Sequence, residues 1–396
     1  MIICNLETII LNAYRTNWSF VKVTCDDGTI GWGEASLGTR ELAVKGCVED
    51  LKRLIVGRNP LEIEKMIFEV TRDSYWKGGP VFGSALSAIE MACWDILGKH
   101  FGAPVYTFLG GKMRDRVRMY ANAWFVGAKT PEEFAAKAKL AVSKGITALK
   151  WDPFGKAHLT LTREEFWRAS EIVGAVREAV GKNVDLLIEC HGRFVQNTAI
   201  EISKELAQYH PMFMEEPVEP TELDMLVEVH KKSAVPIAAG ERIYQIYDWY
   251  KTIKAGALDY AQPDVCHCGG ILETKKIAAF AQAAGVMMSI HNPSGPLANA
   301  AILNLAACTQ NFFIHEIMLT DMPFRSQLSN EEVVYEDGCI LIGDRPGLGV
   351  EINESAVAEH PYEPINLRHY NGNLTNIRPA GKNCYYFKGI APDPEE

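Results

Sequence analysis

Three glutamates recur at equal spacing, and each of them ends a short apolar run. They are Glu189, Glu215 and Glu241, which lie 26 residues apart in the chain. A short apolar stretch that ends in a carboxylate is typical of a buried parallel strand opening onto a polar site. Equal spacing places the three carboxylates on neighbouring strand ends, where together they could bind a hard divalent cation. The spacing therefore predicts a metal site with these three glutamates as its ligands.

Seven consecutive predicted strands in the middle of the chain end in ionisable side chains. In chain order these are Lys150 and Asp152, Glu189 and His191, Glu215, Glu241, Asp264, His291 and Glu316. The members of each pair are two residues apart and so point to the same face of their strand. One such residue alone could be a solvated side chain at the rim of the sheet. The whole set, each preceded by an apolar run, indicates a shared polar site at the strand ends.

The residue types in this set predict proton transfer beside a cation. Oxygen ligands favour Mg²⁺ or Mn²⁺ over zinc, and such a cation could chelate a substrate carboxylate and neutralise the enediolate formed when the α-proton leaves. A lone histidine on a strand is more often a satisfied core residue, but Asp264 can set the tautomer of His291 and make it a base. His191 is placed to protonate a leaving hydroxyl group, and Lys150 and Glu316 could hold the carboxyl oxygens of the substrate.

Strands and helices alternate through the middle of the chain. The predicted strands are Met119–Phe125, Ala148–Asp152, Leu186–His191, Met212–Glu215, Ile237–Glu241, Tyr260–Asp264, Val286–His291 and Phe312–Glu316. Helical patterns between them include Thr162–Ala179, Thr198–Tyr209, Glu222–Lys232 and Leu272–Ala284. Eight strands spaced about 25 residues apart predict an α/β fold, a closed (β/α)8 barrel. A doubly wound nucleotide-binding fold is the competitor, but no Gly-x-Gly-x-x-Gly pattern follows a first strand.

The first hundred or so residues show a different order, with strands first and helices after them. Strand patterns at Thr8–Leu11, Trp18–Thr24 and Ile30–Glu34 surround a hairpin turn at Asp26–Thr29, and helical patterns follow at Glu41–Ile55, Pro60–Arg72 and Ser84–Gly98. This order predicts an α+β unit. A glycine- and charge-rich break at Leu109–Arg116 places the boundary near residue 117. The predicted domains are an α+β unit over residues 1–117, a barrel over 118–350 and a C-terminal segment over 351–396 with a polar tail from about Leu367.

Composition and charge exclude several classes of protein. A net charge of -10 argues against nucleic acid as a partner, because phosphate binding needs a basic surface, although a bound metal would still allow an anionic substrate. No secretory signal and no membrane-spanning run is visible, so a cytoplasmic location is expected. The ten cysteines are dispersed, and Cys266-His267-Cys268 lacks the second pair that a zinc finger needs.

At these residues the chain resembles the enolase superfamily, in its mandelate racemase subgroup of acid-sugar dehydratases. The matching segments are Leu149–Gly155, Ile188–Phe194, Met214–Val218, Ala239–Arg242, Gln262–Asp264 and His291–Pro296. The similarity runs nearly end to end, from the Asp27–Glu34 hairpin to Pro346–Val350. It implies that the α+β unit caps the barrel and that the C-terminal segment completes this cap. It also implies metal ligation by the three glutamates, with Glu215 rather than Glu216 as the second ligand, a His291–Asp264 base and His191 as the general acid.

One departure from the subgroup favours dehydration over racemisation. Racemases of the subgroup carry Lys-x-Lys on the second barrel strand, and here Asp152 stands in place of the second lysine. The resemblance therefore implies a hydro-lyase that forms a 2-keto-3-deoxy acid from an aldonate or aldarate. An epimerase or cycloisomerase using the same enolate is the alternative, because His191 or Asp152 could replace the missing base. A catalytically silent barrel is a third reading, but this chain keeps every ligand and the base.

Substrate contacts are predicted at Asp152, Arg193 and Trp124, and at Trp18 and Trp76 in two loops of the cap. Those loops are Asn12–Trp18 and Tyr75–Phe82, since mobile loops over a barrel mouth commonly set specificity. The two cap tryptophans could equally be packed at a domain interface. The resemblance also implies a homo-oligomer, commonly an octamer in the subgroup. The sequence leaves the identity of the sugar acid open.

Overall fold

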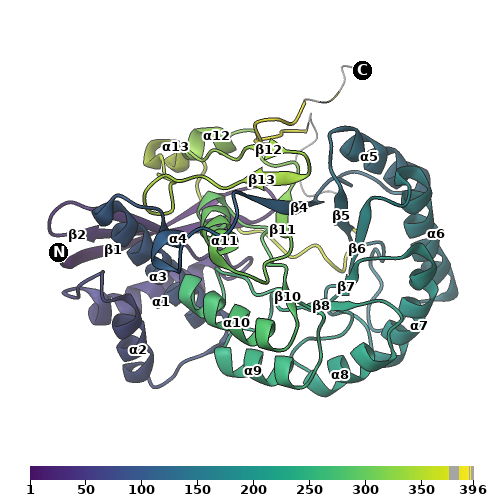
Figure 1. The fold of residues 1–396 in the computed structure, drawn as a ribbon, viewed down its shortest axis with the longest axis horizontal. Helices are drawn as coiled ribbons and strands as arrows, with labels where there is room; N and C mark the ends of the chain where they lie inside the picture. The colour runs from purple at the N-terminus through teal and green to yellow at the C-terminus, as the bar shows by residue number, and fades with distance from the viewer. Residues whose placement is uncertain (374–382, 392, 394–396) are drawn as a thin grey trace.

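The computed structural model describes residues 1–373, 383–391 and 393, and the rest of the predicted polar tail lies outside these residues. Its N-terminal part is a three-stranded antiparallel meander followed by four helices. The strands are β1 (Ile3–Asn12), β2 (Asn17–Cys25) and β3 (Ile30–Glu34), and the helices are α1 (Glu41–Ile55), α2 (Ile63–Asp73), α3 (Gly79–Phe101) and α4 (Val105–Phe108). These elements lie beside one side of the barrel (Figure 1).

Two glycines of β3 allow helix α3 to pack directly on the meander. A Cβ atom on Gly33 would lie 1.9 Å from the carbonyl oxygen of Ala88, and one on Gly31 would lie 2.2 Å from that of Ala92. Because any side chain there would collide with backbone, only glycine permits this approach. Helix α3 is thereby buried in the core. It is the one helix among the described residues that is long and apolar enough to cross a membrane, and 78% of its most apolar stretch is buried.

The second part is a ring of eight parallel strands. They are β4 (Arg116–Asn122), β5 (Ala148–Trp151), β6 (Asp185–Glu189), β7 (Phe213–Glu215), β8 (Ile237–Ala239), β9 (Tyr260–Ala261), β10 (Met287–Met288) and β11 (His315–Met318). Each pairs with the next along the chain as far as β10. Strand β11 pairs with β4. A bridge between Met288 of β10 and Phe312, just before β11, joins the last two barrel segments, so the barrel is closed. This confirms the predicted (β/α)8 fold with an N-terminal capping domain.

Helices surround the barrel strands (Figure 1). They are α5 (Pro131–Ser143), α6 (Arg163–Val180), α7 (Gln196–Leu206) with a short 3₁₀ turn η1 (Ala207–Tyr209), α8 (Leu223–Lys232), α9 (Ile246–Lys254), α10 (Ile271–Ala283) and α11 (Pro296–Cys308). The strand β4 begins at Arg116, so the predicted boundary at residue 117 falls inside this strand.

The chain after the barrel returns to the capping domain. It forms α12 (Arg325–Leu328), the hairpin β12 (Tyr335–Glu336) and β13 (Cys339–Leu341), and α13 (Glu354–Ala358). Helix α13 forms an ion pair through Glu354 with Lys22 of β2. Farther on, Pro361 bridges to Leu11 of β1, and the backbone carbonyl of Glu363 accepts a hydrogen bond of 2.8 Å from Asn17. These contacts tie the segment after residue 350 to the cap.

Buried carboxylates of the cap bind the N-termini of two barrel helices. Glu34 accepts hydrogen bonds from the backbone amides of Gly295 and Ala298 at the start of α11, at 2.7 and 2.9 Å. Glu90 of α3 accepts from the amides of Ile271 and Leu272 at the start of α10, both at 2.8 Å. Amides at a helix start have no partner within the helix, and the helix dipole favours negative charge there. The two carboxylates therefore fix the cap over the barrel.

Replacing Glu90 by Gln should reveal a pH-dependent contribution to stability. Burial raises the pKa of Glu90 from 4.5 to about 7. Between these values the folded state binds more protons than the unfolded state, so the stability that this group contributes falls as the pH rises. We expect the free energy of unfolding of wild type, relative to Glu90→Gln, to fall by on the order of 2–3 kcal/mol between pH 4.5 and pH 7.5. Urea unfolding measures it, and a difference that stays constant or grows with pH would contradict the expectation.

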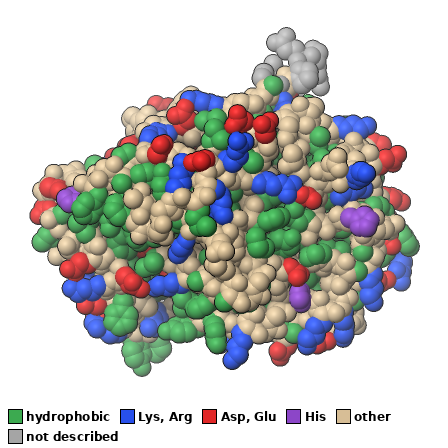
Figure 2. Space-filling view, viewed as in Figure 1, with side chains coloured by type: hydrophobic (Ala, Val, Ile, Leu, Met, Phe, Trp, Pro, Cys, Tyr) green, Lys and Arg blue, Asp and Glu red, His purple; other side chains and the backbone are tan. Residues whose placement is uncertain are grey.

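The outer surface carries charges of both signs. Basic and acidic side chains are interspersed over the face in Figure 2, where hydrophobic side chains gather at the lower left near α2. Phe68 of α2 and Tyr247 of α9 are among the large exposed hydrophobic residues, at 63% and 74% exposed.

Candidate active site

The ionisable strand-end residues converge at one end of the barrel. Lys150 is the penultimate residue of β5, Glu189 ends β6 and Glu215 ends β7, while Glu316 lies in β11. Glu241, Asp264 and His291 follow β8, β9 and β10 by two or three residues. A cavity of about 200 Å³ opens here, and its lining includes Lys150, Asp152, Glu189, His191, Glu241 and His291. The carboxyl ends of parallel strands thus bring together residues that are far apart in the chain.

Lys150 lies at the centre of a buried cluster of carboxylates. Its Nζ is 2.7 Å from Glu215 Oε2, 3.0 Å from Glu316 Oε1 and 3.3 Å from Glu189 Oε2. Burial alone would lower the pKa of Lys150, but the charges of Glu215 and Glu316 raise it well above its usual value. The lysine is therefore a cation that neutralises part of the charge of three carboxylates.

The cluster holds more carboxyl groups than Lys150 can neutralise. Burial and the neighbouring Glu189 raise the pKa of Glu215 well above its usual value, and burial raises that of Glu189 to about 7. Oε1 of Glu215 is buried and accepts no hydrogen bond from the described residues. A buried carboxylate oxygen without a donor is costly, and an all-oxygen donor set suits a hard cation. The residues at the ends of β6 and β7 therefore fit a divalent cation.

The third predicted ligand faces elsewhere in this structure. Glu241 Oε2 lies 2.7 Å from Nε2 of His291, whereas Glu189 and Glu215 face Lys150. Accordingly, no group of three His, Cys, Asp or Glu side chains within residues 1–373, 383–391 and 393 has the arrangement of a formed metal site. Metal ligation by the three glutamates stays a prediction.

His291 and Asp264 form the predicted pair. Nδ1 of His291 lies 2.7 Å from Asp264 Oδ2, and the other oxygen of Asp264 accepts a hydrogen bond of 2.7 Å from the amide of Cys266. Burial alone would lower the pKa of His291, but the charge of Glu241 and the hydrogen bond with Asp264 raise it well above its usual value. Because Asp264 accepts from Nδ1, proton transfer would use Nε2, which is paired with Glu241 in this structure.

His191 is held by a carboxylate that the sequence assigned to substrate binding. Nδ1 of His191 lies 2.7 Å from Asp152 Oδ2, and Arg193 forms an ion pair with the same oxygen. Burial alone would raise the pKa of Asp152, but the charge of Arg193 holds it below its usual value. Arg193 is 1% exposed and also donates to the carbonyls of Cys190 and Gly155, at 2.9 and 3.0 Å. The donors of Arg193 are thus used within the protein in this structure, and its contact with substrate hydroxyls stays a prediction.

The backbone at His191 has a left-handed conformation, with φ of 51°. Its amide donates a hydrogen bond of 2.7 Å to Glu189 Oε1. The next residue, Gly192, also has a positive φ, and a Cβ atom there would lie 1.8 Å from Arg242. Arg242 binds Glu216 through Nε at 2.8 Å. Glu216 thus pairs with an arginine, and Glu215 is the glutamate that joins the carboxylate cluster.

Glu316 is tied into the barrel on both of its oxygens. Oε1 accepts from Lys150 and, at 2.9 Å, from Asn122, while Oε2 accepts from the amide of Asn292 at 2.8 Å. Burial alone would raise the pKa of Glu316, but the charge of Lys150 and the other donors hold it at about 2. Asn122 and Asn292 were missed in the sequence, although both lie at a strand end or directly after a predicted histidine.

The structure does not bring the three predicted tryptophans into the cavity. Trp124 is buried, and its Nε1 donates a hydrogen bond of 2.9 Å to the backbone carbonyl of Lys150, so its ring packs against β5. Trp18 is 2% exposed and packs against Arg325, with 5.1 Å between the guanidinium and the ring. Trp76 is 86% exposed and packs edge-on against Tyr75. None of the three belongs to the described lining of the cavity, although Trp18 lines a small hollow beside it, and their assignment as substrate contacts stays a prediction.

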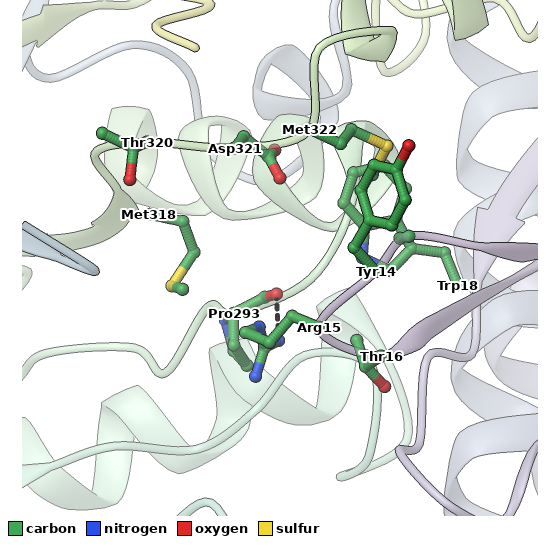
Figure 3. A pocket seen from close by; sticks show the side chains of 10 residues that line it. Tyr14, Arg15, Thr16, Trp18, Pro293, Met318, Thr320, Asp321 and Met322 are labelled. Atoms are coloured by element: carbon green, nitrogen blue, oxygen red, sulfur yellow. Dashed lines mark hydrogen bonds between the residues drawn. The ribbon is translucent and has the colours of Figure 1, made fainter. Parts of the chain in front are cut away.

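The cap loop Asn12–Trp18 reaches the cavity through a different residue, Arg15. A small hollow beside the cavity shares Arg15, Thr16, Pro293 and Met318 with it (Figure 3). Arg15 donates a hydrogen bond of 2.6 Å to the carbonyl of Pro293, which lies two residues after His291. Burial lowers the pKa of Arg15. The loop that the sequence placed at the mouth is there, but its arginine rather than its tryptophan lines the site.

The Cys266-His267-Cys268 cluster has a structural role. Nε2 of His267 lies 2.9 Å from the carbonyl oxygen of Ser36 in the cap, and Cys268 contacts Thr274 of α10. These contacts link the turn after β9 to its surroundings.

Comparison with known proteins agrees with this architecture. Residues 9–110 match the family described as mandelate racemase/muconate lactonizing enzyme, N-terminal domain, and residues 133–356 match the family described as enolase C-terminal domain-like. A D-gluconate dehydratase of Thermoproteus tenax is 38% identical over 91% of this chain and 74% of its own. A D-gluconate/D-galactonate dehydratase of Picrophilus torridus is 36% identical over 87% of this chain and 88% of its own.

A solved structure is similar over almost the whole chain. It is a member of the enolase superfamily from Salmonella Typhimurium, with a TM-score of 0.87 and 30% identity over 91% of this chain and 98% of its own. Two domain families match in the order that the fold shows, and the similarity to named relatives extends across both domains. This chain therefore belongs to the mandelate racemase/muconate lactonizing enzyme group of the enolase superfamily.

Proposed function

We propose that this enzyme is a divalent-metal-dependent dehydratase that converts an aldonate or aldarate into a 2-keto-3-deoxy acid. The proposal rests on one observation: His191 and His291 are each held through Nδ1 by a carboxylate, and both line the same cavity. They follow β6 and β10, which are four strands apart in a ring of eight. The two histidines therefore lie on opposite sides of the barrel and line one cavity. The gluconate and galactonate dehydratases among its relatives support the same class of substrate.

The residues divide the reaction between the two sides of the cavity. Glu189, Glu215 and Glu241 would hold Mg²⁺ or Mn²⁺, which when bound supplies positive charge at the carboxyl end of the substrate. Lys150 places an ammonium beside Glu189 and Glu215, and to bind a substrate carboxyl oxygen it would exchange one of its three carboxylate contacts. His291 takes the proton from C2 through Nε2, since Asp264 occupies Nδ1.

His191 completes the dehydration from the other side. Asp152 occupies its Nδ1, so Nε2 can deliver a proton to the departing 3-hydroxyl as the C3–O bond breaks. Water leaves, and the resulting enol rearranges to the ketone. The proton at C2 and the hydroxyl at C3 are thus handled by different residues, and this separation makes the two steps independently testable.

A second candidate function is epimerisation at C2. The His191–Asp152 pair has the same Nδ1-to-carboxylate arrangement as the His291–Asp264 pair, and it lies on the opposite side of the barrel. A base on each face is what a two-base epimerase requires. Dehydration creates a ketone and lowers the mass of the compound by one water molecule. Epimerisation changes neither the carbonyl content nor the mass.

A panel of aldonic and aldaric acids tests the proposal. We expect at least one of them, D-gluconate and D-galactonate included, to give a product that reacts with semicarbazide when Mg²⁺ is present. The double variant His191→Asn/His291→Asn serves as the control for contaminating activity. Turnover that changes optical rotation without forming a ketone would instead support the epimerase.

Replacing Asp152 by Asn should slow dehydration more than proton removal. The substitution takes the carboxylate from Nδ1 of His191 and leaves the buried charge of Arg193 unpaired. We expect dehydration to fall by about 100-fold or more, which is the lower range for losing a general acid, while deuterium exchange at C2 continues through His291. The matched variant Asp264→Asn should lose both activities. Equal loss of exchange in the two variants would show that Asp152 serves the proton-removing side, and circular dichroism checks that both variants are folded.

A further inference from the structure

The chain beyond the barrel lies across the mouth of the cavity. We call residues 363–370 the C-terminal strap. Its residues Ile365, Asn366, Leu367, Arg368 and His369 belong to the lining of the cavity. Asn17 of β2 binds the first residue of the strap. Its side chain donates a hydrogen bond of 2.8 Å to the carbonyl of Glu363 and accepts one of 3.3 Å from the amide of Glu363. Figure 1 shows this segment, in yellow, passing across the barrel. The predicted polar tail from Leu367 is thus, at its beginning, a wall of the site.

The strap touches the histidine that the proposed dehydration uses as its acid. The rings of His369 and His191 have centroids 4.1 Å apart and are tilted by 52°. The hydroxyl of Tyr370 donates a hydrogen bond of 2.7 Å to the backbone carbonyl of His191. The ring of Tyr370 also packs against Arg193, whose guanidinium lies 5.4 Å from the ring centroid. His191 is therefore held from three directions, by Asp152 at Nδ1, by a ring contact and at its carbonyl.

The Tyr370 hydrogen bond falls where the backbone is least favourable. His191 has a positive φ, a conformation that disfavours residues other than glycine and is maintained by surrounding contacts. Its amide is bound to Glu189 and its carbonyl to Tyr370, at 2.7 Å each. Two hydrogen bonds thus fix the peptide units on both sides of the residue.

His369 offers chemistry that suits a hydroxylated chain. Burial and the neighbouring His191 lower its pKa to about 3, so the ring is neutral near pH 7. A neutral imidazole carries one N–H donor and one acceptor nitrogen, and a hydroxyl group can pair with either. The contact with His191 places this ring beside the position where the 3-hydroxyl would be protonated.

We propose that the C-terminal strap is part of the sugar-acid site, with His369 as a residue that binds a substrate hydroxyl and Tyr370 as a positioning residue for His191. This inference rests on the proposed function for the substrate it names. The capping domain and the barrel alone leave this wall of the cavity incomplete. The strap thereby contributes to selecting among sugar acids that share a carboxyl end and differ in their hydroxyl groups.

The variant His369→Phe tests the binding role. Phenylalanine keeps a ring against His191 but has no hydrogen-bonding atom. We expect KM for the best substrate of the panel to rise about fivefold to tenfold, as for loss of one hydrogen bond, while kcat changes less than about threefold, because binding is lost equally in the ground state and the transition state. The matched control is His360→Phe, the same change nine residues upstream, where the ring stacks on Phe324 at 3.4 Å. KM values of both variants equal to that of wild type would overturn the binding role.

The variant Tyr370→Phe tests the strap without any substrate. Losing the hydroxyl should free the carbonyl of His191 and speed amide hydrogen exchange in residues 190–193, by about threefold or more. The control is Tyr362→Phe, a partly buried tyrosine directly before the strap. Unchanged exchange in Tyr370→Phe would overturn the positioning role. Failure of the proposed function is seen separately, as wild-type enzyme that turns over no sugar acid, since the exchange measurement needs none.

Discussion

Replacing His291 by Asn should abolish both dehydration and exchange of the C2 proton with deuterium from the solvent. Asp264 holds Nδ1 of His291 at 2.7 Å, so Nε2 is the nitrogen that takes the proton, and no other residue is assigned to that face. A general base typically contributes 10²–10⁴-fold to the rate, by order of magnitude. Product formation and the loss of the C2–H signal in D₂O measure the two activities in one proton NMR experiment.

The matched variant His191→Asn should separate these activities. It removes the acid that protonates the departing hydroxyl, so dehydration should fall by about 100-fold or more. The enolate can still form and take back deuterium at C2, so exchange should persist. A loss of less than about tenfold in either variant would contradict a general acid–base role. Exchange that survives in His291→Asn and vanishes in His191→Asn would show that the two roles are reversed.

Removing divalent cations should have an effect of similar size. Glu189 and Glu215 are buried, and within the described residues Lys150 is their one cationic partner and Glu215 Oε1 has no donor. Chelation with EDTA is therefore expected to abolish dehydration, and Mg²⁺ or Mn²⁺ to restore it. Full activity of metal-free enzyme would contradict the metal site and the reaction proposed around it.

A binding measurement separates the metal from catalysis. Titration calorimetry should show Mn²⁺ binding to wild-type enzyme and at least tenfold weaker binding to Glu215→Gln, because one charged ligand becomes neutral. Glu216→Gln is the control, since Glu216 binds Arg242 instead. Equal losses in the two variants would show that Glu215 has no special place in the cation site.

The barrel could be predicted from the sequence because local patterns carried most of the information. Apolar runs of strand length recur at regular intervals, and helix starts are marked by chemistry that is visible in the chain. The helical pattern that was predicted from Thr162 opens with Thr-Arg-Glu-Glu, and in the structure Thr162 and Glu165 each bond the backbone amide of the other, at 3.2 and 2.9 Å. Strand ends were overestimated: β9 and β10 have two residues each. Such strands end where hydrogen bonding to the neighbouring strands ends, and those neighbours are distant in the sequence.

The site was predictable where function is tied to a strand end, and not where it depends on long-range packing. Lys150, Glu189 and His291 lie where their strands place them. The exposure of Trp76 could not be predicted, because an aromatic residue in a loop has the same sequence pattern whether it faces a cavity or solvent. His369 was missed because its contact with His191 joins residues 178 positions apart, and no local pattern marks a chain that crosses a barrel mouth.

The reaction of the wild-type enzyme in D₂O tests the central claim most directly. Purified enzyme with Mg²⁺ and a sugar acid that it turns over should yield a 2-keto-3-deoxy acid. Proton NMR should show that the C2–H signal of the substrate disappears and that a C3 methylene appears carrying one deuterium. A product that retains its 3-hydroxyl, carries deuterium at C2 and has the inverted configuration there would contradict dehydration and would support the two histidine–carboxylate pairs as the two bases of an epimerase.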